Sequence, residues 1–133
     1  MTPAKKILIV EDSEDVRRML VRLLETASYS VLTASDGVGG LQTADGDRPD
    51  LIITDLNMPR LDGVQMITML RALPDYDHVP IIALTASGGD VLTQATEAGA
   101  DVVANKPLDV RWLLDTIARL LAESKPRQSR AGC

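Results

Sequence analysis

A chain of 133 residues, with 45% hydrophobic and 25% charged residues, has the size and composition of one globular domain. These values exclude a chain that is unstructured throughout, and the net charge of −5 argues against nucleic-acid binding by the body of the protein. Aromatic residues make up only 2% of the chain, which argues against a stacking platform for single-stranded nucleic acid. We therefore expect an aliphatic core.

The cysteine count and the lengths of the apolar segments bear on the compartment. Cys133 is the one cysteine, which excludes an internal disulfide and a cysteine-based zinc site. No apolar stretch approaches the roughly 20 residues that span a bilayer. The N-terminus also lacks the apolar region and cleavage site of a signal peptide. The sequence therefore predicts a cytoplasmic protein without a membrane partner.

Short apolar runs predict five strands. Residues 7–10, 51–54 and 79–84 are almost continuously Ile, Leu and Val, which is typical of strands buried on both faces of a sheet. Residues 31–34 and 101–104 are weaker strand candidates.

Segments with helical periodicity lie between these runs. The first has a clear apolar stripe and outward-facing arginines, the next is shorter, and the last has Asp109 as a predicted N-cap. The apolar positions of the three helices are Val16, Met19, Leu20, Leu23 and Leu24; Val64, Ile67, Met69 and Leu70; and Leu113, Leu114, Ile117, Leu120 and Leu121. Residues 37–45 and 90–98 are two further predicted helices, the second ended by Gly99.

Strand and helix alternate five times, which predicts an α/β fold with a five-stranded parallel sheet and helices on both faces. The sequence shows no internal repeat and no second domain, so we expect one domain over residues 1–123. Residues 124–133 are polar, basic and without pattern, and they are predicted to form a disordered tail.

Chemically active side chains follow the predicted strands. Ligands of open α/β sheets bind beyond the carboxyl ends of the strands, so these positions are the first place to look for a site. They hold Glu11, Asp12, Asp55, Asn57, Thr85 and Lys106. A single acid after a strand is most often a helix cap or a loop residue, but the occurrence of all these residues at one edge favours a site.

The three acids predict a metal site with phosphoryl chemistry. Glu11, Asp12 and Asp55 supply the hard oxygen ligands that suit Mg²⁺, and a divalent cation relieves the repulsion among three carboxylates. A carboxylate can also attack phosphorus to form an aspartyl phosphate. The metal and the ammonium group of Lys106 would then stabilise the charge on the transferring group.

The motifs at these strand ends resemble those of response-regulator receiver domains, the two-component family that includes the chemotaxis response regulator. The resemblance covers about residues 5–122 and rests on four blocks of sequence. The blocks are Ile-Val-Glu-Asp at 9–12, Asp-Leu-Asn-Met-Pro at 55–59 with Asp62-Gly63, Thr85-Ala86, and Lys106-Pro107. It implies a flavodoxin-like (βα)5 receiver domain with strand order 2-1-3-4-5.

The resemblance also implies a role for each acid. Asp55 would be the phosphoacceptor. Asp12 would bind Mg²⁺ directly, and Glu11 would act through water. The backbone carbonyl of Asn57 would be a further ligand of the metal, which leaves the side chain of Asn57 free to tune hydrolysis of the phosphate.

Thr85 and Lys106 would each contact a phosphoryl oxygen, and the peptide bond between Lys106 and Pro107 would be cis. Two positions depart from the family pattern. Val103 stands where the family often has an aromatic ring that moves inward on activation, and Leu108 stands where Phe is common. The phosphorylation chemistry survives both changes, but a weakly switching domain or a phosphate shuttle becomes more plausible.

The implied function is a signalling module that is phosphorylated on aspartate in a two-component or phosphorelay pathway. It would catalyse its own phosphotransfer and dephosphorylation without being an ordinary enzyme. The upstream partner would be a histidine kinase or a histidine phosphotransfer protein. The downstream partner would be an unknown protein that binds the face of the fourth helix, fifth strand and last helix.

Three other functions use similar residues or a similar fold. A haloacid-dehalogenase-type phosphatase would need a second aspartate two residues after Asp55, where this chain has Asn57. A flavodoxin-like cofactor binder would need a phosphate-cradling loop after the first strand, where residues 11–15 are strongly acidic. The chain could also be a receiver excised from a hybrid histidine kinase or a longer transcription regulator.

Overall fold

A computed structural model describes residues 4–58, 61–73, 76, 78–86, 89–106 and 109–123. Over these residues five strands alternate with five helices, as predicted. The strands are β1 (Lys6–Val10), β2 (Ser30–Ala34), β3 (Leu51–Asp55), β4 (Ile81–Thr85) and β5 (Val102–Asn105). The helices are α1 (Glu14–Thr26), α2 (Gly37–Asp47), α3 (Gly63–Arg71), α4 (Asp90–Ala98) and α5 (Val110–Glu123).

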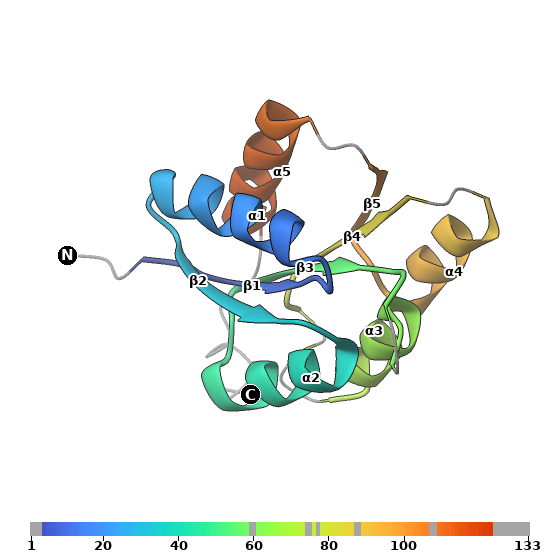
Figure 1. Ribbon diagram of the computed structural model, residues 1–133. Coiled ribbons are helices and arrows are strands. Elements are labelled where there is room, and N and C mark those ends of the chain that lie inside the picture. The colour runs from blue at the N-terminus through green and yellow to red at the C-terminus, as the bar shows by residue number, and fades with distance from the viewer. Residues whose placement is uncertain are drawn as a thin grey trace.

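The five strands form one parallel sheet in the order β2-β1-β3-β4-β5 (Figure 1). This confirms the predicted fold class and the strand order that the resemblance implied. From β1 the chain adds β2 on one side and then β3, β4 and β5 on the other. The carboxyl ends of β1 and β3 therefore lie where the strand order reverses, and ligands of such sheets bind at this position.

Alternate residues of each strand pack into two separate cores. Ile7 and Ile9 of β1 face one core, with residues of α1 and α5, while Leu8 and Val10 face the other, with residues of α2, α3 and α4. Figure 1 shows α1 and α5 on one side of the sheet and α2 and α3 on the other. Because both faces are covered, the central strands must be apolar at nearly every position.

The weaker sequence patterns belong to the strands at the two edges of the sheet. Every residue of β3 and β4 is buried, whereas β2 and β5 are only partly buried. An edge strand has a neighbour on one side only, so fewer of its positions are shielded from water. This explains why residues 31–34 and 101–104 were less clear as strands.

The structure corrects three assignments to the core. Met19 and Met69 were placed on apolar helix faces, but they are 48% and 49% exposed, whereas Met66 of α3 is fully buried. The core is also not wholly aliphatic. Tyr76 is buried, and its hydroxyl group donates a hydrogen bond to the carbonyl of Ala44 in α2. A buried tyrosine needs such a partner for its polar end.

Polar side chains begin α1, α3 and α5, and Asp109 is the one that the sequence predicted as an N-cap. Ser13 and Asp62 accept hydrogen bonds from backbone N–H groups in the first turns of α1 and α3, and Asp109 accepts one from Trp112. Gly99 ends α4 with a φ of 123°, as predicted. None of the described helices is long and apolar enough to cross a membrane. The bond between Lys106 and Pro107, Leu108 and the predicted tail at 124–133 lie outside the described residues.

Helix α2 offers a matched pair of glycine substitutions, because four of its 11 residues are glycine. A Cβ at Gly46 would meet nothing within 4 Å, whereas one at Gly37 would lie 2.3 Å from the carbonyl oxygen of Leu61. We expect Gly46→Ala to stabilise the protein by about 0.5 kcal/mol, since alanine loses less backbone entropy in a helix. Gly37→Ala should destabilise it by about 2 kcal/mol through the steric clash. Urea denaturation of both variants checks this, and a destabilising Gly46→Ala would contradict it.

Candidate functional site

The sheet brings the chemically active residues to one edge. Glu11 and Asp12 follow β1 directly, Asp55 is the last residue of β3, and Thr85 is the last residue of β4. Lys106 comes one residue after the end of β5, where Asn105 pairs with Thr85. Because all the strands are parallel, their carboxyl ends meet at this edge.

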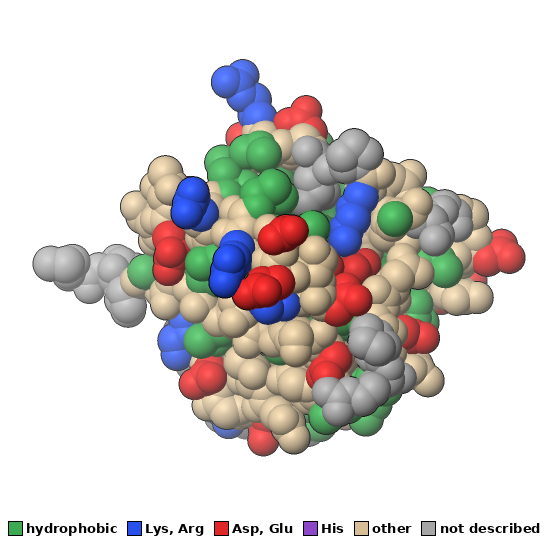
Figure 2. Space-filling view, viewed as in Figure 1, with side chains coloured by type: hydrophobic (Ala, Val, Ile, Leu, Met, Phe, Trp, Pro, Cys, Tyr) green, Lys and Arg blue, Asp and Glu red, His purple; other side chains and the backbone are tan. Residues whose placement is uncertain are grey.

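Three carboxylates form a tight cluster there. One oxygen atom from each of Glu11, Asp12 and Asp55 lies within 4.8 Å of the others. The side chains of Glu11 and Asp55 are almost inaccessible to solvent, at 1% and 5% exposure, whereas Asp12 is exposed. Figure 2 shows acidic side chains gathered on the face that holds the carboxyl ends of β1 and β3. The cluster is therefore open to solvent on the side of Asp12.

Lys106 bridges the two buried acids. Its Nζ atom lies 3.0 Å from Oε1 of Glu11 and 3.3 Å from Oδ2 of Asp55. Burial alone would lower the pKa of Lys106, but the hydrogen bond to Glu11 and the negative charges of Asp55 and Glu11 outweigh burial, and the pKa is raised. Lys106 is therefore held as a cation in direct contact with Asp55.

Burial disfavours the charged form of Glu11. Burial raises the pKa of its carboxyl group, although hydrogen bonds from Lys106 and from the backbone N–H of Ser13 oppose the shift. The nearby charge of Asp55 raises the pKa further. One ammonium group thus faces three carboxylates, and the cluster keeps an excess of negative charge that favours a cation.

The backbone around the cluster is held by short connections. The guanidinium of Arg17 in α1 donates to the carbonyl of Glu11 at 2.8 Å, which ties α1 to the end of β1. The backbone N–H of Asn57 donates to Oδ1 of Asp55 at 3.2 Å. Gly63 begins α3 so close to β3 that a Cβ there would lie 2.5 Å from the carbonyl oxygen of Asp55. The contacts of Arg17 and Gly63 hold the backbone at the ends of β1 and β3, and the Asn57 N–H holds the side chain of Asp55 directly.

The hydroxyl group of Thr85 contacts an amide side chain of the site. It donates a hydrogen bond of 2.8 Å to Oδ1 of Asn57, in the connection between β3 and α3. The sequence placed both residues at the site but did not indicate this contact, since the two lie 28 positions apart and nothing in their spacing pairs them. The side chain of Asn57 thus has a partner in the site beyond the role expected of its backbone carbonyl.

The residues of the cluster fit a magnesium ion. Mg²⁺ binds carboxylate and carbonyl oxygens and retains several water molecules, so it suits a site with few protein ligands and an opening to solvent. The cluster has this character, with hard oxygens only and with Asp12 exposed. The positions of Glu11, Asp12 and Asp55 are therefore consistent with the predicted metal site.

A family model for the response regulator receiver domain matches residues 7–118 of the chain. The chain belongs to the response-regulator receiver family. The match spans the sheet except for Lys6, its first residue, and most of α5, so it includes every residue of the site. It identifies this part of the chain as a signalling module of the kind found in two-component systems.

Curated relatives carry this receiver within longer proteins. The chain is 42% identical over 127 residues to the transcriptional regulatory protein PrrA of Mycobacterium tuberculosis, covering 95% of this chain and 52% of the relative. It is 35% identical over 123 residues to the hybrid signal transduction histidine kinase D of Dictyostelium discoideum, covering 92% of this chain and 8% of the relative. The receiver thus spans about half or less of these proteins.

A solved structure supports the comparison at the site. The receiver domain of a sensor histidine kinase from Pseudomonas aeruginosa PAO1 is 30% identical, with a TM-score of 0.83. The alignment covers 90% of this chain and 99% of that one. That structure is described with a magnesium ion coordinated in its active-site cleft. The acidic cluster of this receiver is consistent with such a site.

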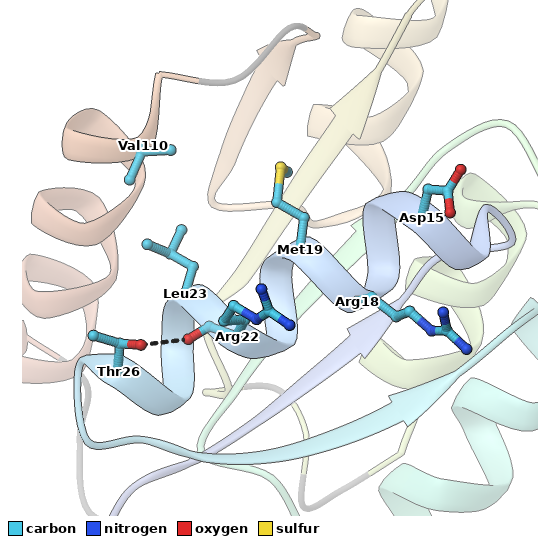
Figure 3. Close-up of a pocket in the computed structure, with 7 residues that line it drawn as sticks. All are labelled: Asp15, Arg18, Met19, Arg22, Leu23, Thr26 and Val110. Atoms are coloured by element: carbon cyan, nitrogen blue, oxygen red, sulfur yellow. Dashed lines mark hydrogen bonds between the residues drawn. The ribbon is translucent and has the colours of Figure 1, made fainter.

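A concave surface, separate from the acidic cluster, lies on α1. Figure 3 shows it between α1 and the first turn of α5, with Met19, Leu23 and Val110 along an apolar floor and Arg18 and Arg22 beside it. None of the seven residues that line it is one of the predicted site residues. This groove therefore has no part in the metal chemistry.

Proposed function

We propose that this receiver takes up a phosphoryl group on Asp55 and that the modification switches a protein-interaction surface. One observation supports this above the others: the nearly buried carboxylate of Asp55 lies 3.3 Å from the Lys106 ammonium group and beside two further acids. A carboxylate in such surroundings is a nucleophile next to fixed positive charge and a metal-binding cluster.

In the proposed reaction a carboxylate oxygen of Asp55 attacks the phosphorus of a phosphohistidine. An O–P bond forms, the P–N bond breaks, and its electron pair goes to the imidazole nitrogen, which takes up a proton. Lys106 and Thr85 would each contact a phosphoryl oxygen. Thr85 lies at the end of β4, which neighbours β3 in the sheet, so its hydroxyl group is on the correct edge for this contact.

Asp12, Asp55 and the backbone carbonyl of Asn57 would hold Mg²⁺ directly, and Glu11 would act through water. When bound, the ion neutralises negative charge on the phosphoryl group and on the acids. Asp12 is the exposed member of the cluster, so it faces the side from which ion and phosphodonor would arrive.

The proposed upstream partner is a histidine kinase or a histidine phosphotransfer protein, and the downstream partner is a protein of unknown identity. Binding of this partner is proposed for the α4-β5-α5 face, as the family resemblance implies, and the exposed Trp112 (37%) in the first turn of α5 offers an apolar side chain for contact.

Phosphorylation with acetyl phosphate tests this function. With Mg²⁺ we expect uptake of about one phosphoryl group per chain, measured by intact mass, because the site has one nucleophilic acid. EDTA should abolish the uptake, since the acids and the phosphoryl group then repel one another. Continuous release of phosphate from small phosphomonoesters, without a stoichiometric phosphoprotein, would instead favour a phosphatase of the haloacid-dehalogenase type.

A further inference from the structure

The hydrogen bond between Thr85 and Asn57 joins two neighbouring strand ends of the site. The side chain of Thr85 is fully buried, and its hydroxyl group donates to Oδ1 of Asn57 at 2.8 Å. Asn57 is exposed and comes from the connection after β3, whereas Thr85 ends β4. The hydrogen bond therefore links the two strand ends that flank the phosphorylation site.

A threonine hydroxyl has one proton and so donates to one acceptor at a time. In the structure that proton is directed to Asn57. In the proposed phosphorylated state it would be directed to a phosphoryl oxygen. One proton cannot serve both acceptors, so in the proposed phosphorylated state Thr85 would no longer donate to Oδ1 of Asn57.

We infer that Asn57 is a positioning residue that holds Thr85 in the unphosphorylated arrangement and so opposes the switch. This inference rests on the proposed function, because it needs a phosphoryl group that competes for the hydroxyl. An interaction made in one state only shifts the equilibrium toward that state. The side-chain amide of Asn57 therefore stabilises the inactive state relative to the phosphorylated one.

Asn57 also places its hydrogen bond with Thr85, here called the latch, beside α4. Asn57 lines a groove between the β3–α3 connection and α4, together with Met58, Val91 and Gln94. When Thr85 turns to the phosphoryl group, Oδ1 of Asn57 loses its donor at the wall of this groove. The change at the hydroxyl thereby occurs at the wall of a groove that Val91 and Gln94 of α4 also line, in a chain that has Val103 at the usual aromatic position.

Beryllofluoride, a stable mimic of the phosphoryl group, tests the latch by equilibrium binding. The wild type and Asn57→Ala are titrated with beryllofluoride at saturating Mg²⁺, and binding is followed by the backbone amide signals in NMR spectra. We expect Asn57→Ala to bind about three to ten times more tightly, the range for one neutral hydrogen bond that only the free state contains. Thermal melts of both proteins show that they are folded.

Thr85→Val supplies the control, because it removes the hydroxyl group and keeps the shape of the side chain. In that background Asn57→Ala should leave the beryllofluoride affinity unchanged, since no proton remains for the two acceptors to share.

The methyl signal of Thr85 gives a second measurement that does not need the double variant. In free Asn57→Ala it should move toward the position that the wild type reaches only with beryllofluoride.

The possible results distinguish a failure of the latch from a failure of the phosphoacceptor function. If the wild type binds no beryllofluoride, the phosphoacceptor function fails and the latch fails with it. If the wild type binds and Asn57→Ala binds equally, with an unmoved Thr85 methyl signal, only the latch is overturned. A gain in affinity that persists in the Thr85→Val background overturns it too, because the effect then does not pass through the hydroxyl.

Discussion

Replacement of Asp55 by asparagine is expected to reduce acetyl-phosphate labelling from about one phosphoryl group per chain to background, because an amide oxygen is too weak a nucleophile to attack phosphorus. The substitution keeps the shape of the side chain. It also removes one charge from a cluster in which three carboxylates lie within 4.8 Å of one another. We therefore expect the variant to be at least as stable as the wild type, so that lost labelling does not reflect unfolding.

Asp115→Asn is the matched control for this experiment. Asp115 is an exposed residue of α5 and lies outside the acidic cluster. The variant loses the same charge and should label like the wild type. Intact mass spectrometry after incubation with acetyl phosphate and Mg²⁺ gives the stoichiometry for all three proteins. Undiminished labelling of Asp55→Asn would show that the phosphoacceptor is another residue.

Loss of the guanidinium group of Arg71 is expected to cause a large loss of stability. At the end of α3 this group donates two hydrogen bonds to the carbonyl of Gly99, at 3.0 and 2.8 Å. It also donates to the carbonyls of Tyr76 and Val79, at 2.6 and 2.7 Å, and to the carboxylate of Asp101 at 2.9 Å. One side chain thus joins α3 to the segments that precede β4 and β5.

We expect Arg71→Met to destabilise the protein by about 3 kcal/mol, which corresponds to a fall of roughly 10 °C in Tm for a domain of this size. Methionine keeps the apolar stem but leaves three backbone carbonyls without their charged donor. Arg71→Lys should recover little of the loss, because an ammonium group cannot reproduce the planar fork of donors. Urea denaturation and differential scanning calorimetry measure both variants.

Arg18→Met is the control for the loss of an arginine as such. Arg18 forms a salt bridge with Glu14 one turn away in α1, and both side chains are highly exposed, at 76% and 62%. Such surface pairs contribute at most about 0.5 kcal/mol. If Arg71→Met were no more destabilising than Arg18→Met, Arg71 would not be the tie between α3 and the neighbouring segments.

Predictions from the sequence succeeded where burial imposes a simple pattern. The strands over 51–54 and 79–84 were clear because both faces of the central sheet are covered, and the final helix was clear because Leu113, Ile117 and Leu120 face the core. Met19 and Met69 were misplaced because periodicity shows that a residue lies near an apolar face but not how far the neighbouring element covers it. Arg71 and Tyr76 have roles that depend on partners distant in the chain.

Three features were predictable from the amino-acid sequence alone, because each depends on local pattern or on motifs. They are the alternation of strands and helices, the placement of the carboxylates and the lysine at the strand ends, and the family. Only the tertiary structure decided which side chains share a hydrogen bond. Lys106 bridges Glu11 and Asp55, and Thr85 donates to Asn57, through contacts between residues 28 to 95 positions apart. Such contacts are set by the order and register of the parallel strands, which bring distant residues together without leaving a signal in their spacing.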